Sequence, residues 1–178
     1  PLKEHLEAIG HRDAFQYVEG LVKDKVELSE YAIKVIHSLV LMDRPEDKGV
    51  YRRIPVRIMG AFHEPPQPYM VEPLMRDLLL KHAERKKSMH IVEAVALFHL
   101  DFEGIHPFID GNGRTGRLLM NLELMQNGYP AIYIKFTDRR RYYDAFDLHY
   151  RSKSAELMIR IIAEYMNERL GQYLTVLC

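Results

Sequence analysis

The sequence has only one cysteine, Cys178, and no long uninterrupted hydrophobic run. A single cysteine excludes an internal disulfide and any zinc site built from several thiolates, and it fits a reducing compartment. A membrane-spanning helix needs roughly 18–20 consecutive apolar residues, and the charged segment 1–10 is unlike a signal peptide. We therefore expect a cytoplasmic protein that has no membrane partner.

The sequence also has no excess of charge of either sign, because 25 Lys and Arg residues stand against 25 Asp and Glu residues. A generally basic surface is thereby excluded, so nucleic acid is not an expected partner. The chain has 178 residues, of which 47% are hydrophobic and 28% charged. This composition is typical of one globular domain, which we expect to span residues 1–178.

Almost all hydrophobic periodicity in the chain has the helical repeat. The expected helices cover residues 1–22, 29–42, 70–83, 91–105, 113–126, 137–150 and 156–170. Two of them, 91–105 and 113–126, are apolar around most of their circumference, which is typical of buried helices. The sequence therefore predicts an all-α bundle that is arranged around these two central helices.

One region departs from the helical pattern. Residues 50–63 alternate β-branched and charged side chains, with Ile54, Val56 and Ile58 in phase, and this predicts a short β-hairpin. The proline-rich stretch 63–68 follows and is expected to be an extended loop.

The segment with the clearest chemistry joins the two central helices, where residues 106–117 read HPFIDGNGRTGR. Its glycine turn leads directly into a helix N-terminus, and both features bind anions, phosphate above all. Arg114 and Arg117 lie three residues apart, so they share one face of the helix and can hold phosphate oxygens. The loop therefore predicts a phosphate site.

Two further residues of this segment add reactive groups. Asp110 offers a hard oxygen ligand, and Mg²⁺ is usually held by one or two carboxylates together with substrate phosphates. His106 has a reference pKa near 6.5, which suits a general base at neutral pH. These groups indicate phosphoryl or nucleotidyl transfer. The letters GNGRTG also match a dinucleotide-binding motif, but that motif requires a preceding strand, which is not predicted here.

The segment resembles the signature of the Fic family, His-x-Phe-x-Asp/Glu-Gly-Asn-Gly-Arg-x-x-Arg, at every defining position. The broader resemblance runs from about residue 11 to about residue 162, and residues 49–66 resemble the flap region of the family. It implies a Fic-type helical bundle with a β-hairpin flap. It also implies transfer of AMP from ATP to a Ser, Thr or Tyr hydroxyl of a target protein, which the flap binds as an extended segment.

The resemblance also assigns roles to individual residues. His106 is implied as the general base, Asp110 as the Mg²⁺ ligand, and Phe108 as the side chain that locks the loop. The implied anion hole and phosphate ligands are Gly111, Asn112, Gly113, Arg114 and Arg117. Phosphotransferase relatives carry Ala-Asn-Lys-Arg where this chain has Gly-Asn-Gly-Arg, so the resemblance favours adenylylation.

Three other positions match the family in part. Glu19-Gly20 resembles the end of an inhibitory motif, Ser/Thr-x-x-x-Glu-Gly/Asn, which implies that Glu19 pairs with Arg117; an ordinary surface glutamate is the alternative. Tyr142 and Tyr143 resemble a pair that contacts adenine, although core packing explains them equally well. Tyr150 stands where relatives have an asparagine.

Several alternatives stay open from the sequence. The same site could use another nucleotide or a phosphodiester donor, could remove AMP, or could be silenced in a regulatory module. ATP and a protein target are the implied partners, and exposed apolar helix faces favour a homodimer. Pro1 in place of an initiator Met and the apolar ending suggest a fragment, with room for a further domain after Cys178.

Overall fold

The computed structural model describes residues 2–177, and within that range the chain is all-helical with no strand. The α-helices are α1 (Leu2–Lys23), α2 (Glu30–Val40), α3 (Pro68–Ser88), α4 (Ile91–Ile105), α5 (Asn112–Gln126), α6 (Arg139–Ser152) and α7 (Glu156–Leu177). A short 3-10 helix, η1 (Phe136–Asp138), precedes α6. The predicted all-α class is therefore confirmed for the described residues.

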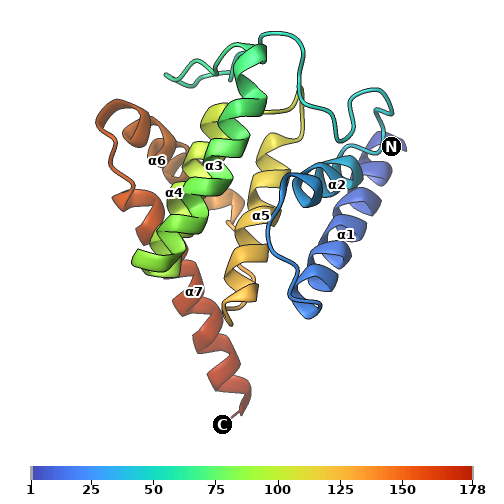
Figure 1. Ribbon diagram of the computed structural model, residues 1–178. Coiled ribbons are helices and arrows are strands. Elements are labelled where there is room, and N and C mark those ends of the chain that lie inside the picture. The colour runs from blue at the N-terminus through green and yellow to red at the C-terminus, as the bar shows by residue number, and fades with distance from the viewer. Residues whose placement is uncertain (1, 178) are drawn as a thin grey trace.

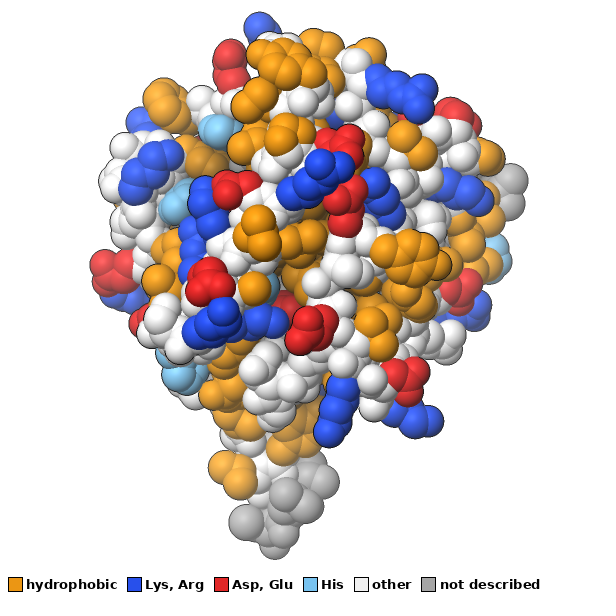
Figure 2. Space-filling view, viewed as in Figure 1, with side chains coloured by type: hydrophobic (Ala, Val, Ile, Leu, Met, Phe, Trp, Pro, Cys, Tyr) orange, Lys and Arg blue, Asp and Glu red, His pale blue; other side chains and the backbone are white. Residues whose placement is uncertain are grey.

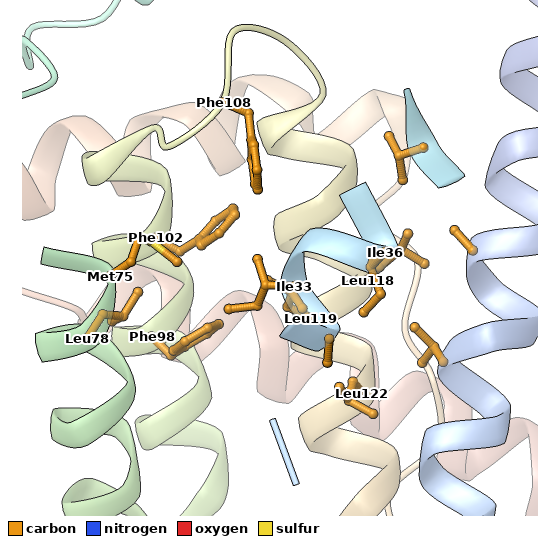
Figure 3. Packing of buried hydrophobic residues seen from close by; sticks show 14 of the residues in the cluster. Ile33, Ile36, Met75, Leu78, Phe98, Phe102, Phe108, Leu118, Leu119 and Leu122 are labelled. Carbon is orange, nitrogen blue, oxygen red and sulfur yellow. The ribbon is translucent and has the colours of Figure 1, made fainter. Parts of the chain in front are cut away.

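Helices α4 and α5 lie at the centre of the molecule, as their apolar surfaces predicted. Figure 1 shows α1 and α2 on one side of this pair and α6 and α7 on the other. One hydrophobic cluster joins the pair to α1, α2 and α3, and a second joins it to α6 and α7. Phe98, Phe102 and Phe108 belong to the first cluster, which Figure 3 shows from close by. Both faces of α4 are therefore covered by other helices.

The first two helices cross at very close range. A Cβ atom at Gly10 of α1 would overlap the carbonyl oxygen of Leu39 in α2. A glycine at this position lets the two backbones approach, and the close approach brings α1 against α5 as well. This packing sets which residues of α1 face the loop between α4 and α5.

The predicted β-hairpin at residues 50–63 is not confirmed. This stretch is a loop that passes over the top of the bundle in Figure 1. The amide of Arg52 donates to the carbonyl of Pro107, outside the stretch, at 2.9 Å, while the amide of Ala61 closes only a local turn with Ile58. A two-stranded hairpin is marginally stable by itself, and the alternating pattern carried no information about these competing partners.

The surface carries charges of both signs. Figure 2 shows blue and red side chains interspersed over the visible face, in keeping with the balanced composition. None of the helices within residues 2–177 combines the length and hydrophobicity that a membrane crossing requires.

The close crossing of α1 and α2 makes a testable prediction. We expect Gly10→Ala to lower the free energy of unfolding by about 1–3 kcal/mol, because the added methyl group overlaps a backbone oxygen that cannot move alone. Gly20→Ala on the same helix is the matched control, since a Cβ there meets no atom within 4 Å. The control should raise stability by roughly 0.5–1 kcal/mol through helix propensity. Urea unfolding followed by circular dichroism measures both, and equal effects would contradict the close crossing.

Candidate active site

The loop between α4 and α5 is closed by its own side chains. His106 ends α4 with a φ of 50°, and Gly111 precedes α5 with a φ of 77°, so both lie in the left-handed region. Asn112 accepts a hydrogen bond from the amide of Phe108 at 2.9 Å and donates to the Phe108 carbonyl at 2.8 Å. A non-glycine residue at positive φ is costly, and such strain is concentrated at functional sites.

His37 of α2 holds this loop, and the sequence reasoning did not identify it. Its Nε2 donates to the Asp110 carbonyl at 2.9 Å, and its Nδ1 accepts from the amide of Gly49 at 2.9 Å. The ring stacks on Phe108 with centroids 3.6 Å apart. Burial lowers the pKa of His37 to about 4, so the ring is neutral and can accept at one nitrogen while donating at the other. A lone histidine on the apolar face of the 29–42 segment was the available signal.

Arg52 is a second residue that the sequence reasoning missed. Its Nε donates to the His106 carbonyl at 2.8 Å, and its Nη2 donates to the Pro66 carbonyl at 2.5 Å and to the Ile105 carbonyl at 3.3 Å. The guanidinium is buried, and its positive charge lies at the carbonyl end of α4, where the helix dipole favours a cation. Arg52 thus ties the 50–66 loop to the central loop.

His106 has the features of a general base. Its Nδ1 lies 3.3 Å from the Glu103 carbonyl oxygen, to which it donates in the tautomer that leaves the Nε2 lone pair available. Burial lowers the pKa of His106, which keeps the ring unprotonated at neutral pH. The side chain lines a cavity of about 420 Å³. A neutral imidazole beside a cavity can take a proton from a bound hydroxyl.

The predicted anion site lies at the start of α5. The first hydrogen bond within α5 runs from the Thr115 amide to the Gly111 carbonyl at 2.9 Å, so the amides of residues 112–114 precede it. The Gly111 amide instead donates to the Asp110 carboxylate at 2.6 Å. Gly111 therefore contributes its backbone conformation to this turn, while the amides available to an anion come from the residues that follow.

Asp110 and Arg114 lie together at the mouth of this site. The Asp110 carboxylate is 3.7 Å from Arg114 and 3.4 Å from Arg44, and Arg114 is also 3.7 Å from Glu7 of α1. Within the described residues no group of three or more His, Cys, Asp or Glu side chains is arranged to hold a metal ion. One partly exposed carboxylate does fit Mg²⁺ that takes its remaining ligands from phosphates and water.

The cavity places several predicted residues together. Its lining residues include His106, Gly113, Arg117, Arg139, Tyr142, Tyr143, Phe146, Asp147 and Tyr150. The aromatic side chains and Arg139 come from α6, whereas Arg117 and Gly113 come from α5. The cavity therefore has an aromatic side on α6 and a side on α5 that carries the Arg117 guanidinium.

The two predicted tyrosines differ in their surroundings. Tyr142 is buried, and its hydroxyl is 2.6 Å from Nε2 of His99 in the core. Tyr143 is 50% exposed and lies against the Arg139 guanidinium. Tyr150 stacks on His63 and donates to the Leu100 carbonyl at 3.1 Å. Of the two predicted residues, Tyr143 is thus the one whose ring is open to a ligand.

The predicted pairing of Glu19 with Arg117 is not formed in this structure. Glu7 of α1 lies 3.7 Å from Arg114, and burial together with the charges of Arg117 and Arg114 lowers the pKa of His11, so this part of α1 faces the arginines. Glu19 is exposed and lies eight residues further along α1, a helical rise of roughly 12 Å, where its charge acts on Tyr133. The partial motif match could not reveal which turn of α1 faces α5, because the crossing of α1, α2 and α5 decides that.

Comparison with known proteins bears on both fold and site. Residues 27–124 match the Fic/DOC family. A curated relative, protein adenylyltransferase Fic of Drosophila ananassae, is 37% identical over 176 residues, which is 97% of this chain and 35% of the relative. The chain thus spans about a third of the length of the curated relatives that it matches.

Solved structures share the fold. Fic-1 from C. elegans superposes with a TM-score of 0.88 at 26% identity, over 99% of this chain and 53% of that chain. A Fic domain containing signaling protein from Bacteroides thetaiotaomicron superposes with a TM-score of 0.86 at 24% identity, over 96% of this chain and 71% of that chain. The helical arrangement described above is therefore the fold of these proteins.

The neutral state of His37 makes stability depend on pH. Its pKa falls from 6.5 to about 4 on folding, so the unfolded state binds a proton first as the pH drops through this window. The stabilising contribution of His37 is complete above pH 6.5 and is lost as the pH falls towards 4.

We therefore expect His37→Phe, which keeps a stacking ring but loses two hydrogen bonds, to lower the free energy of unfolding by about 1–3 kcal/mol at neutral pH. The difference from the wild-type protein should shrink between pH 6.5 and 4. Urea unfolding at a series of pH values measures this, with His5→Phe at an exposed histidine as the control. A difference that stays constant with pH would show that His37 is not held neutral.

Proposed function

This chain belongs to the Fic/DOC family, and from that premise we propose that it transfers AMP from ATP to a hydroxyl group of a target protein. The observation that carries the proposal is the position of His106. Its imidazole lines one cavity together with Gly113 at the start of α5 and with Arg117. A base, amide donors and a guanidinium around one cavity suit attack on a phosphate.

The proposed reaction follows from these positions. Nε2 of His106 takes the proton of the incoming Ser, Thr or Tyr hydroxyl, and the oxygen attacks the α-phosphorus of ATP. The bond from that phosphorus to the bridging oxygen of the β-phosphate breaks, and pyrophosphate leaves. Amides at the start of α5 donate to the phosphate oxygens as negative charge develops there.

Arginines and a carboxylate complete the phosphate site of this proposal. Arg114 and Arg117 bind the β- and γ-phosphates, for which planar guanidinium groups are well suited. Asp110 would hold Mg²⁺, which when bound alongside the phosphates neutralises part of their charge. Arg44 lies near the same carboxylate and orients it.

The aromatic side of the cavity suits the nucleoside. Tyr143 is exposed and stacks on the adenine in this proposal, while Tyr142 is held by His99 and forms the wall behind it. ATP is favoured over a smaller phosphodiester donor because the cavity continues from Arg117 to the aromatic side chains of α6.

The protein target lies along the loop 50–63 in an extended form. This loop forms one wall of the cavity through residues 58–61, and its exposed apolar side chains include Met59 and Phe62. An extended target segment can pair with backbone groups of such a loop, which would then adopt the strand conformation expected from its sequence. Cytoplasmic location and homodimer formation stay predictions of the sequence.

Labelling with α-³²P-ATP and Mg²⁺ in a lysate tests the activity. His106→Ala should lower the rate of transfer by about 10²–10⁴-fold, the range that a general base contributes, while calorimetric binding of ATP persists. Arg140→Ala is the control, because Arg140 is exposed and lies next to Arg139 in sequence but does not line the cavity. This variant should transfer the label at the wild-type rate. Transfer by the His106→Ala protein at the wild-type rate would overturn the proposed base. Absence of ATP binding to the wild-type protein would instead favour a silenced module.

The position of Glu19 makes a separate prediction. Because Glu19 does not reach Arg117 in this structure, Glu19→Gly should leave auto-AMPylation unchanged within experimental error. Labelling of both proteins with α-³²P-ATP measures this, after correction for the fraction folded, since glycine in a helix costs up to about 1 kcal/mol. A clear rise in labelling of the variant would restore the inhibitory role that the sequence suggested.

A further inference from the structure

One buried carboxyl group of the cavity has no role in the proposed reaction. Glu103 lies in the last turn of α4, is only 9% exposed and lines the same cavity as His106 and Arg117. Its Oε1 has no hydrogen-bond partner, and its Oε2 is 3.9 Å from Nδ1 of His106. A buried, unpartnered carboxyl oxygen costs free energy, so its presence calls for an explanation.

A second buried glutamate shows how this chain otherwise accommodates such a group. Glu123 of α5 is fully buried, and although its Oε1 also has no hydrogen-bond partner, its Oε2 pairs with His82 at 2.9 Å and with Lys86 at 3.0 Å. Glu103 has no ion-pair partner of this kind among the described residues, apart from the distant His106 contact. The absence of a side chain at Gly116 leaves room for this carboxyl group, since a Cβ atom at Gly116 would overlap Oε1 of Glu103.

The groups that face Glu103 set its charge. They are His99 on the same helix, His106 on the loop, Arg117 of α5, and Tyr142 and Tyr150 of α6. Burial raises the pKa of Glu103 to about 7, and the charge of Arg117 acts in the opposite direction. Among the described residues that face Glu103, Arg117 is thus the group whose charge favours the ionised carboxylate.

We propose that Glu103 compensates the charge of Arg117 before a nucleotide binds, and that the phosphates of the nucleotide take over this role while Glu103 takes up a proton. Glu103 is then a positioning residue, because it keeps Arg117 directed into the cavity. When the phosphates bind, Glu103 becomes neutral, so that a carboxylate and a phosphate do not repel each other. The inference rests on the proposed function, since it requires phosphates at Arg117.

The direction of the proton transfer follows from electrostatics alone. An anion near Glu103 disfavours its carboxylate, and competition for Arg117 removes the charge that stabilised it. Both effects raise the pKa of Glu103, so nucleotide binding at slightly alkaline pH draws a proton from solvent onto the carboxyl group. By the same linkage, the affinity for nucleotide should fall as the pH rises, by at most about tenfold per pH unit.

Calorimetry with α,β-methylene ATP and Mg²⁺ tests the inference, because this nucleotide cannot be cleaved between its α- and β-phosphates. Titrations at pH 7.5 in buffers of different ionisation enthalpy count the protons taken up on binding. We expect Glu103→Gln, which has the same shape but cannot ionise, to take up fewer protons than the wild-type protein and to bind with less dependence on pH. Protons carried by the nucleotide itself cancel in this difference.

Two variants make the test specific. Asp147→Asn removes another cavity carboxylate, one that accepts from the Phe62 amide, and should keep the wild-type proton uptake. His106→Asn removes the other titratable side chain beside Glu103 and should still take up protons on binding. Uptake that persists in Glu103→Gln, or that disappears only in His106→Asn, would overturn the inference.

A measurement on the wild-type protein keeps the inference testable if Glu103→Gln does not fold. The ¹³C shift of the Glu103 carboxyl, followed by NMR in the wild-type protein, should report a higher pKa when the nucleotide is bound, and an unchanged or lower value would overturn the inference. Wild-type protein that binds no nucleotide would overturn the proposed function and this inference with it. Binding without a shift would overturn the inference alone.

Discussion

The loop between the two central helices depends on one neutral imidazole. His37 reaches from α2, stacks on Phe108 and bridges two backbone groups that are far apart in sequence, at Gly49 and Asp110. Protonation would turn its accepting nitrogen into a second donor and break the bridge. The geometry of the groups on this loop, from His106 to Asp110, therefore depends on the packing that keeps His37 buried and neutral.

The two helix ends that meet at this loop have opposite polarity, and the chain uses each of them. The carbonyl end of α4 is matched by the buried guanidinium of Arg52, which also anchors the loop over the cavity. The amide end of α5 is partly matched by the Asp110 carboxylate and otherwise faces the site. A substrate anion and the carboxylate both suit this end of the helix, because the dipole favours negative charge there.

Charge inside the cavity is arranged differently from charge in the core. Glu123 is paired through its Oε2 with two side chains of α3, His82 and Lys86, and forms part of the packing between α3 and α5. Glu103, Arg117 and His106 instead line one cavity, where burial raises the pKa of Glu103 and the charge of Arg117 acts in the opposite direction without a close ion pair. In a low dielectric such groups respond strongly to an incoming charge, as the proposed binding of a polyphosphate would require.

The sequence by itself determined the helical class, the central pair of helices and the residues of the loop between them, because periodicity and a dense local motif depend only on near neighbours. Only the tertiary structure brought His37 and Arg52 to that loop, separated Tyr142 from Tyr143 by burial, and placed Glu19 away from Arg117. These outcomes depend on how α1, α2 and α6 pack against α4 and α5. No local pattern encodes that packing, since it follows from the simultaneous fit of surfaces that are distant in sequence.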